Sequence, residues 1–378
     1  MSTHTSAAAL ILGAALLGLG TPAASAAADK PTVEVHAYMQ NRGYLAAGAN
    51  PTFRAERISV STQAALPHDS SGYIELYYHP WATASGLYLE SAYYDTPLGP
   101  GRLRVGKGRR LTFGITPSYG NRRTSNYGVV AEAFTQDRIQ GVQYLLQRGA
   151  LDAGLSVQTA FRLGTRALGE IPGDAAYNAA HAVPHLSLRD LPGELSSKPQ
   201  VSARLGGRWG DGPNGLRAGF SGSWGGLDGR DLANLRTSAP TNPLTPGGTP
   251  ALLPASTTRA GQWQLGPDFT YRHPSGLLAQ GELFFAEVSA LGFAGGYLLG
   301  GYEAPSGWRF YARYGLQEMH TARTANPLSW DTRQFSLSVV QPLRQGLWLQ
   351  YEYERNSERT HGPKVNNDLF FAELFTGF

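Results

Sequence analysis

The residues of this chain that are best suited to chemistry are basic side chains gathered in one short segment. Residues 98–148 contain nine Lys or Arg residues and two acidic ones, so the segment has a net charge of +7. The whole chain of 378 residues carries +4, which leaves −3 for all other residues together. Arg binds phosphate and carboxylate groups through a planar fork of donors, and rings of basic side chains in pores favour anions. The segment is therefore a candidate path for anions.

Seven side chains of this segment are the candidates for lining such a path. They are Arg102, Arg104, Lys107, Arg109, Arg110, Arg122 and Arg123. Residues 101–107 alternate as in a β-strand, with Leu103 and Val105 on one face and Arg102 and Arg104 on the other. If the apolar face contacts lipid, these two arginines point into an aqueous interior.

Two other roles stay open for these side chains. The inward-pointing arginines would brace the wall if they pair with carboxylates such as Glu75 or Glu90. The arginines of residues 108–137 would instead contact lipopolysaccharide phosphates if that connection lies near an outer rim. Alternation fixes the direction of the strand residues only, so Arg102, Arg104 and Lys107 are the stronger candidates.

The elements that must position these residues are β-strands. Along residues 347–354, for example, Leu349 and Tyr351 lie on one face, while Gln350 and Glu352 lie on the other. The sequence predicts sixteen strands, near residues 32–40, 53–64, 71–79, 87–94, 101–107, 138–148, 153–163, 199–209, 216–225, 261–272, 277–288, 292–303, 308–319, 330–341, 347–357 and 367–378.

The connections between these strands indicate how the strands are arranged. Every second connection is a short Gly/Pro-rich turn, such as His273-Pro274-Ser275-Gly276 or Gln341-Pro342-Leu343-Arg344. All three long connections, 108–137, 164–198 and 226–260, fall in the other set. A soluble sandwich has no reason to sort its connections in this way, whereas an outer-membrane barrel has short turns at one rim and long loops at the other. We therefore expect an all-β fold: a transmembrane antiparallel β-barrel of about 16 strands (14–18).

The composition and the two ends of the chain fit this expectation. Residues 1–26 resemble a signal peptide that ends in Ala24-Ser25-Ala26, with an N-terminal membrane anchor as the alternative. The remaining residues, 27–378, are expected to form one barrel domain whose third loop, about 108–137, folds inward. The last ten residues resemble the closing strand of an outer-membrane barrel, with Phe378 as the membrane-assembly signal. The mean hydropathy of −0.27 suits strands whose lipid-facing and interior residues alternate.

Part of the sequence also resembles a known family. Phe53-Arg54-Ala55-Glu56-Arg57, Leu103-Arg104-Val105-Gly106-Lys107 and Ala133-Phe134-Thr135-Gln136-Asp137-Arg138 are similar, in this order, to motifs of the phosphate-selective porin family (porins O and P and their relatives). The resemblance covers about residues 50–148 and the terminal Phe378. It implies 16-stranded trimeric porins with an inward-folded third loop. The proline expected before Phe113-Gly114 is absent, and few of the family's loop lysines are present, so a general or weakly anion-preferring porin is expected.

The function expected from these features is passive diffusion across the outer membrane of a bacterium. The expected partners are small hydrophilic solutes, with phosphate or other anions among them, outer-membrane lipid, the barrel-assembly machinery and two further copies of the chain in a homotrimer. Neither a cofactor, a metal, a nucleic acid nor a catalytic residue is expected; the chain has no Cys for a thiolate site. Two alternatives stay open: a non-conducting barrel that acts as a surface receptor or adhesin through residues 164–198 and 226–260, and a barrel hydrolase.

Overall fold

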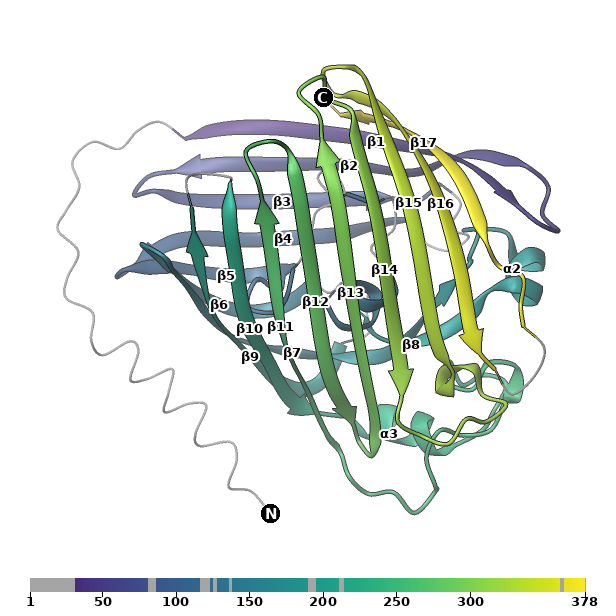
Figure 1. Cartoon of the computed structure of the whole chain (residues 1–378). Coiled ribbons are helices and arrows are strands. Elements are labelled where there is room, and N and C mark those ends of the chain that lie inside the picture. Colours follow the sequence, from purple (N-terminus) through teal and green to yellow (C-terminus); the bar gives the residue numbers. More distant parts are fainter. Residues whose placement is uncertain are drawn as a thin grey trace.

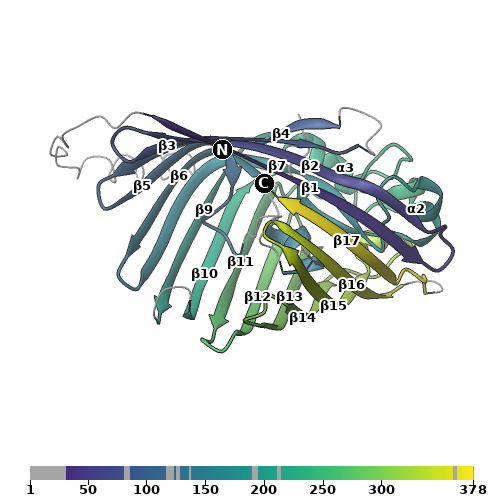
Figure 2. The ribbon, with the colours of Figure 1, turned by 90° about the horizontal axis from the view of Figure 1, so that it is seen from above.

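The structure is a closed β-barrel of sixteen antiparallel strands (Figures 1 and 2). It is a computed structural model that describes residues 31–80, 86–115, 123–124, 128–135, 138–189, 195–210, 214–360 and 364–377. The barrel strands are β1 (Thr32–Ala46), β2 (Thr52–Leu66), β3 (Ser70–Tyr78), β4 (Leu87–Leu98), β5 (Gly101–Arg109), β6 (Arg138–Arg148), β7 (Leu151–Leu168), β9 (Leu195–Trp209), β10 (Gly215–Gly226), β11 (Gly261–Arg272), β12 (Leu277–Val288), β13 (Leu291–Glu303), β14 (Arg309–Met319), β15 (Asp331–Arg344), β16 (Leu347–Arg359) and β17 (Leu369–Gly377). The predicted fold class and all sixteen predicted strands are confirmed.

Alternation along each strand separates an apolar outer surface from a polar interior. On β16, Gln350, Glu352 and Glu354 are buried inside the barrel, while Tyr353 on the other face is exposed. Phe53, with 71% of its surface exposed, is typical of the outer face. Such a surface is stable against lipid rather than water, because exposed apolar side chains order the surrounding water at a free-energy cost.

The first and last strands close the barrel. Residues Tyr38 to Ala46 of β1 pair antiparallel with Gly377 to Leu369 of β17. The pairing of the predicted first and last strands is therefore confirmed, in the second half of β1. Phe378 itself lies outside the described residues.

The connections sort by length as predicted. At one end, here named the turn end, the seven connections have two to five residues: 67–69, 99–100, 149–150, 210–214, 273–276, 304–308 and 345–346. The three long connections all lie at the opposite end, here named the loop end. The predicted turn Gln341-Pro342-Leu343-Arg344 was misplaced: Pro342 belongs to β15, at an irregularity of the register with β16. A proline without a backbone N–H is tolerated at such an irregularity, so it did not end the strand there.

The loop end contains elements that the sequence analysis did not predict. Residues 164–198 include α2 (Ala175–His181) and β8 (Val183–Arg189), and the next long connection includes α3 (Gly229–Arg236). Figures 1 and 2 show α2 and α3 on the same side of the molecule. β8 pairs with Arg162–Leu168 of β7, which follow the residues of β7 that pair with β9 in the barrel wall. None of the helices in the described part of the chain is long and apolar enough to cross a lipid bilayer.

A hydrophobic core lies inside the loop end. It joins side chains from residues 110–135, from the β7–β8 hairpin and from the loop around α3, all packed against strands β12 and β13. Its largest members include Phe113, Phe134, Leu186, Phe284 and Phe293. The loops are therefore packed onto the barrel and onto one another, and this core sets the position of Phe113 and of residues 129–134.

Candidate functional site

The connection after β5 is held against the inner wall of the barrel. Its first residues are fixed by Gln143 of β6, whose side-chain oxygen accepts a hydrogen bond from the amide of Leu111 (2.9 Å) and whose side-chain NH₂ donates to the carbonyl of Arg109 (2.9 Å). Thr112 is hydrogen-bonded to Ser156 of β7 at 2.8 Å. Both partners lie on the interior face, so the chain turns inward as soon as β5 ends.

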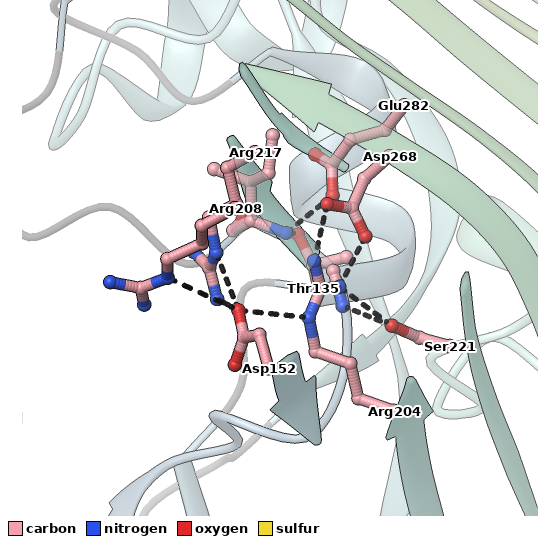
Figure 3. Close-up of polar contacts among 10 residues, drawn as sticks. Thr135, Asp152, Arg204, Arg208, Arg217, Ser221, Asp268 and Glu282 are labelled. Carbon is pink, nitrogen blue, oxygen red and sulfur yellow. Dashed lines mark hydrogen bonds and ion pairs between the residues drawn. The ribbon is translucent and has the colours of Figure 1, made fainter. Parts of the chain in front are cut away.

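The next residues are fixed to strands further along the wall, where Figure 3 shows the acceptors Ser221 and Glu282. The amide of Gly114 donates to the hydroxyl of Ser221 on β10 (3.1 Å), and the amide of Ile115 donates to Oε1 of Glu282 on β12 (2.6 Å). Ser221 also accepts a hydrogen bond from Arg204 of β9 at 3.0 Å. Because backbone amides buried in a barrel need acceptors, these two side chains determine where the segment lies.

Gly114 is required at its position for two reasons. Its φ of +62° lies in the left-handed region, which residues with a Cβ rarely adopt. A Cβ on this residue would also lie 2.6 Å from Oε1 of Glu282 and 2.7 Å from the methyl group of Thr135. The wall and the segment therefore approach each other too closely for any other residue.

Residues 123–124 reach the far side of the barrel. Arg123 donates to the side-chain oxygen of Gln280 on β12, and its carbonyl accepts a hydrogen bond from Gln350 of β16 (3.3 Å). Arg313 of β14 donates to the hydroxyl of Thr124 at 2.5 Å. Contacts from the segment thus extend from β6 to β16, so the described residues between 110 and 135 cross the barrel interior.

Aromatic packing fixes the return of this segment to β6. The rings of Phe113 and Phe134 each stack on Phe284 of β12, with centroids 5.0 and 5.5 Å apart, and Phe134 also lies 5.1 Å from Phe293 of β13. Phe134 stands at the end of a π-helical turn, η2 (Ala131–Thr135). The segment is therefore anchored by polar contacts at its first residues and by apolar contacts at both of its ends.

Two of the predicted path residues are paired with a carboxylate that the sequence analysis did not identify. Arg102 lies 2.5 Å and Arg104 3.0 Å from opposite oxygens of Asp95 on β4. Arg102 also contacts the exposed Asp69 at 2.8 Å, and the guanidinium of Arg104 lies over the ring of Tyr93 at 4.0 Å. Asp95 is buried on the interior face, so both arginines do point inward, and both are partly neutralised there.

The other predicted path residues lie in different environments. Lys107, partly exposed, donates to the carbonyl of Leu89 at 2.9 Å, and Arg109 is half-buried at the end of β5. Arg110 is completely buried and donates to Ser223 of β10 and to the carbonyl of Phe134, each at 3.0 Å, so it supports the segment instead of facing a solute. Burial lowers the pKa of Arg123. Arg122 lies outside the described residues.

Other wall strands carry interior basic side chains that are not among the seven candidates. These are Arg42 on β1, Arg54 and Arg57 on β2, and Arg138 on β6. Arg138 is paired with Glu90 at 2.6 Å, and the guanidiniums of Arg54 and Arg57 lie over the rings of Tyr44 and Tyr77 at 5.4 and 5.0 Å. The interior therefore contains arginines from several strands, several of them close to a carboxylate or an aromatic ring.

Comparisons with known proteins support the fold and leave the family open. No family model matches the sequence, and no curated protein matches it. Among solved structures, the chain resembles the outer membrane channel DcaP of Acinetobacter baumannii (TM-score 0.60, 12% identity, covering 92% of this chain and 97% of that chain). It also resembles OmpT of Vibrio cholerae in its trimer form (TM-score 0.56, 13% identity, covering 93% of this chain and 100% of that chain). A third similar structure is the anion-selective porin of Comamonas acidovorans (TM-score 0.53, 12% identity, covering 92% of this chain and 100% of that chain). At these identities the likeness shows the fold alone: a closed antiparallel barrel of sixteen strands.

Proposed function

We propose that this protein is a passive diffusion channel of the outer membrane, narrowed by the described residues between 110 and 135. The observation that carries the proposal is a closed barrel with an apolar outside, a charged inside and one segment crossing that inside. A barrel of this kind lets solutes pass through its interior, and a segment fixed across the interior limits their size. The turn end then faces the periplasm and the loop end faces the outside.

We further propose a mild preference for anions, of the kind found in arginine-lined pores. Arg102 and Arg104 point inward from β5 towards Asp95, and Lys107 and Arg109 follow them along the same strand. The resemblance of residues 50–148 to phosphate-selective porins supports the same preference. Asp95 limits its strength, because a shared carboxylate reduces the field of two arginines. The trimer implied by that resemblance belongs to this proposal as well, and the structural likeness to OmpT in its trimer form supports it.

Planar-bilayer recording tests the channel directly. The folded protein should insert with discrete conductance steps, and a KCl gradient should give a reversal potential displaced towards that of chloride. Replacing Arg102 and Arg104 with Ser should weaken this displacement. The proposal fails if correctly folded protein inserts into the bilayer and produces no conductance.

One observation favours a second function, that of a non-conducting surface receptor. The loop end is tightly organised: Asn326 donates to the carbonyls of both Leu244 and Pro250, at 2.9 Å each, and so ties two loops together. A rigid loop platform suits recognition of a partner. The same bilayer experiment decides between the two functions, since a receptor of this kind predicts an inserted but silent barrel.

A further inference from the structure

Three arginines surround one carboxylate at the turn end of the barrel (Figure 3). Oδ2 of Asp152 on β7 lies 2.7 Å from Arg217 of β10 and 3.7 and 3.9 Å from Arg208 and Arg204 of β9. The same oxygen makes all three contacts. Each guanidinium has five N–H donors and a carboxylate has about four lone-pair sites, so Asp152 cannot satisfy three of them.

The three arginines share this carboxylate unequally. Arg204 is buried and has its own partner in Asp268 of β11, which accepts two hydrogen bonds from it, one of them 2.7 Å long. Arg217 donates from Nε to Asp152 at 2.7 Å and so takes the closest contact. Arg208 has the 3.7 Å ion pair, which is longer than a hydrogen bond, and 47% of its side chain is exposed.

Arg208 and Arg217 also face each other directly. They are cross-strand partners in the β9–β10 ladder, and the next pair along it, Trp209 and Leu216, is exposed on the outer surface. The two arginines therefore point to the interior. Like charges directly opposite each other destabilise a sheet. A local arrangement that lowers stability marks a candidate for function.

We propose that Arg208 and Arg217 form a binding site for a small oxyanion at the turn end of the interior. A phosphate or carboxylate group has several oxygens for the two guanidinium forks, and its negative charge would remove the repulsion between them. Asp152 and Arg204 are positioning residues. Asp152 orients Arg217, and the pairing of Arg204 with Asp268 leaves most of Asp152 to Arg217.

This site is separate from the predicted path on β5, because it is built on β7, β9 and β10. Only the consequence of the site, which is to concentrate anions at the periplasmic mouth, rests on the proposed function. Binding itself does not require conduction. The two proposals can therefore be tested independently.

Calorimetric titration of the folded protein in detergent tests the site, with inorganic phosphate as one probe and succinate as the other. Wild type should bind at least one of them. Arg208→Gln and Arg217→Gln should each weaken binding about tenfold, the loss expected for a charge-assisted hydrogen bond. Arg208→Lys, which keeps the charge but lacks the fork, should also bind more weakly than wild type.

Arg148→Gln is the matched control. Arg148 lies at the same end of the barrel, but its cross-strand partner is the exposed Leu151, so it faces outward. This variant loses the same charge and should bind like wild type.

Arg208→Gln should also keep or raise the thermal stability of the barrel, because it removes the repulsion between Arg208 and Arg217. The site is disproved if wild type binds neither probe, or if Arg208→Gln and Arg148→Gln bind equally well. Phosphate binding without conductance would contradict the proposed function and leave the site standing.

Discussion

At the scale of single residues, Asp95 determines how much of the charge on β5 acts on a passing ion. It is within 3.0 Å of both Arg102 and Arg104, so one negative charge opposes two positive ones. Replacing Asp95 with Asn should therefore raise the anion preference. Replacing both arginines leaves Asp95 exposed to the path, so that change should shift the selectivity towards cations. Interactions of such partly exposed pairs are worth up to about 1 kcal/mol, so the permeability ratio should change by roughly twofold to fivefold.

Reversal potentials in a KCl gradient measure this ratio. Arg148→Ser, on the outer face, is the control and should leave the potential unchanged. An Asp95→Asn protein with unaltered selectivity would show that this carboxylate lies off the ion path and only braces the wall.

Gly114 tests whether the crossing segment sets the size of the passage. Gly114→Ala should push the segment off the wall, because the new Cβ would meet Oε1 of Glu282 at 2.6 Å. Gly149→Ala is a close control: its φ is similarly positive, at +57°, but a Cβ there meets nothing within 4 Å. Both variants suffer backbone strain of about 1–2 kcal/mol. Only Gly114→Ala should change the single-channel conductance and the exclusion limit for uncharged polymers; equal effects of both variants would assign the change to strain alone.

Some of these residues could be predicted from the sequence and others could not, for a geometric reason. Alternation correctly turned Arg102 and Arg104 inward, but the partner Asp95 emerges only from the β4–β5 register. Arg54 and Arg57 lie on opposite faces by simple alternation. An irregularity opposite Gln40 and Asn41 inserts Glu56 into β2 and brings both arginines to the interior. The sequence carries no clear signal for such a bulge.

At the scale of elements, the π-helical turn η2 and the β7–β8 hairpin form a contact that should depend on pH. Glu132 of η2 lies 3.9 Å from His185 of β8. Burial raises the pKa of Glu132 to about 7, with Arg166 and Arg313 opposing the shift and Glu354 and Glu170 adding to it. Burial and Arg166 lower the pKa of His185 to about 3, so this ring stays neutral near neutral pH.

The direction of the pH effect follows from the raised pKa of Glu132. The packed state favours the protonated carboxyl, so its stabilisation is complete below the ordinary pKa of 4.5 and is lost as the pH rises through about 7. Hydrogen-exchange protection of the η2 and β8 amides should therefore fall between pH 5 and 8. Glu132→Gln, which stays neutral, should keep its protection over this range. A variant that loses protection in parallel with wild type would assign the effect to another group.

The elements inside the long connections were beyond prediction because they depend on the barrel for their packing. Both helices are short, with seven and eight residues, and each begins after an Asp that accepts a hydrogen bond from the first turn. β8 forms only because β7 continues past the wall to pair with it. Residues 237–256 are rich in Pro, Thr and Ser, a composition that gives no signal for an ordered structure. The side chain of Asn242 nevertheless holds this stretch in place, because it donates hydrogen bonds to the carbonyls of Asn234 and Thr237, at 2.8 and 2.6 Å.

At the scale of the whole molecule, closure of the barrel depends on one seam, between β1 and β17. Glu373 of β17 accepts hydrogen bonds from Gln40 (2.5 Å) and from two nitrogens of Arg42 (3.1 and 2.7 Å), and its side chain and that of Arg42 are almost completely buried. The arginine also lies over the ring of Phe371 at 4.7 Å. The pairing of the two strands followed from the strand count, but this network did not, because its members are more than 330 residues apart.

Removing that carboxylate should weaken the entire barrel, not one loop. Glu373→Ala would leave the charge of Arg42 buried without its closest acceptor, a change that costs about 3–5 kcal/mol in proteins. Glu34→Ala, on the same seam strand but 69% exposed, should cost less than about 1 kcal/mol. Urea unfolding in lipid vesicles, followed by the heat-modifiable shift in electrophoretic mobility, measures both values.

Adding Arg42→Met to Glu373→Ala should recover part of the lost stability, since the buried charge is then gone. If Glu373→Ala unfolds at the same urea concentration as wild type, strand pairing alone closes the barrel and the buried network has another role.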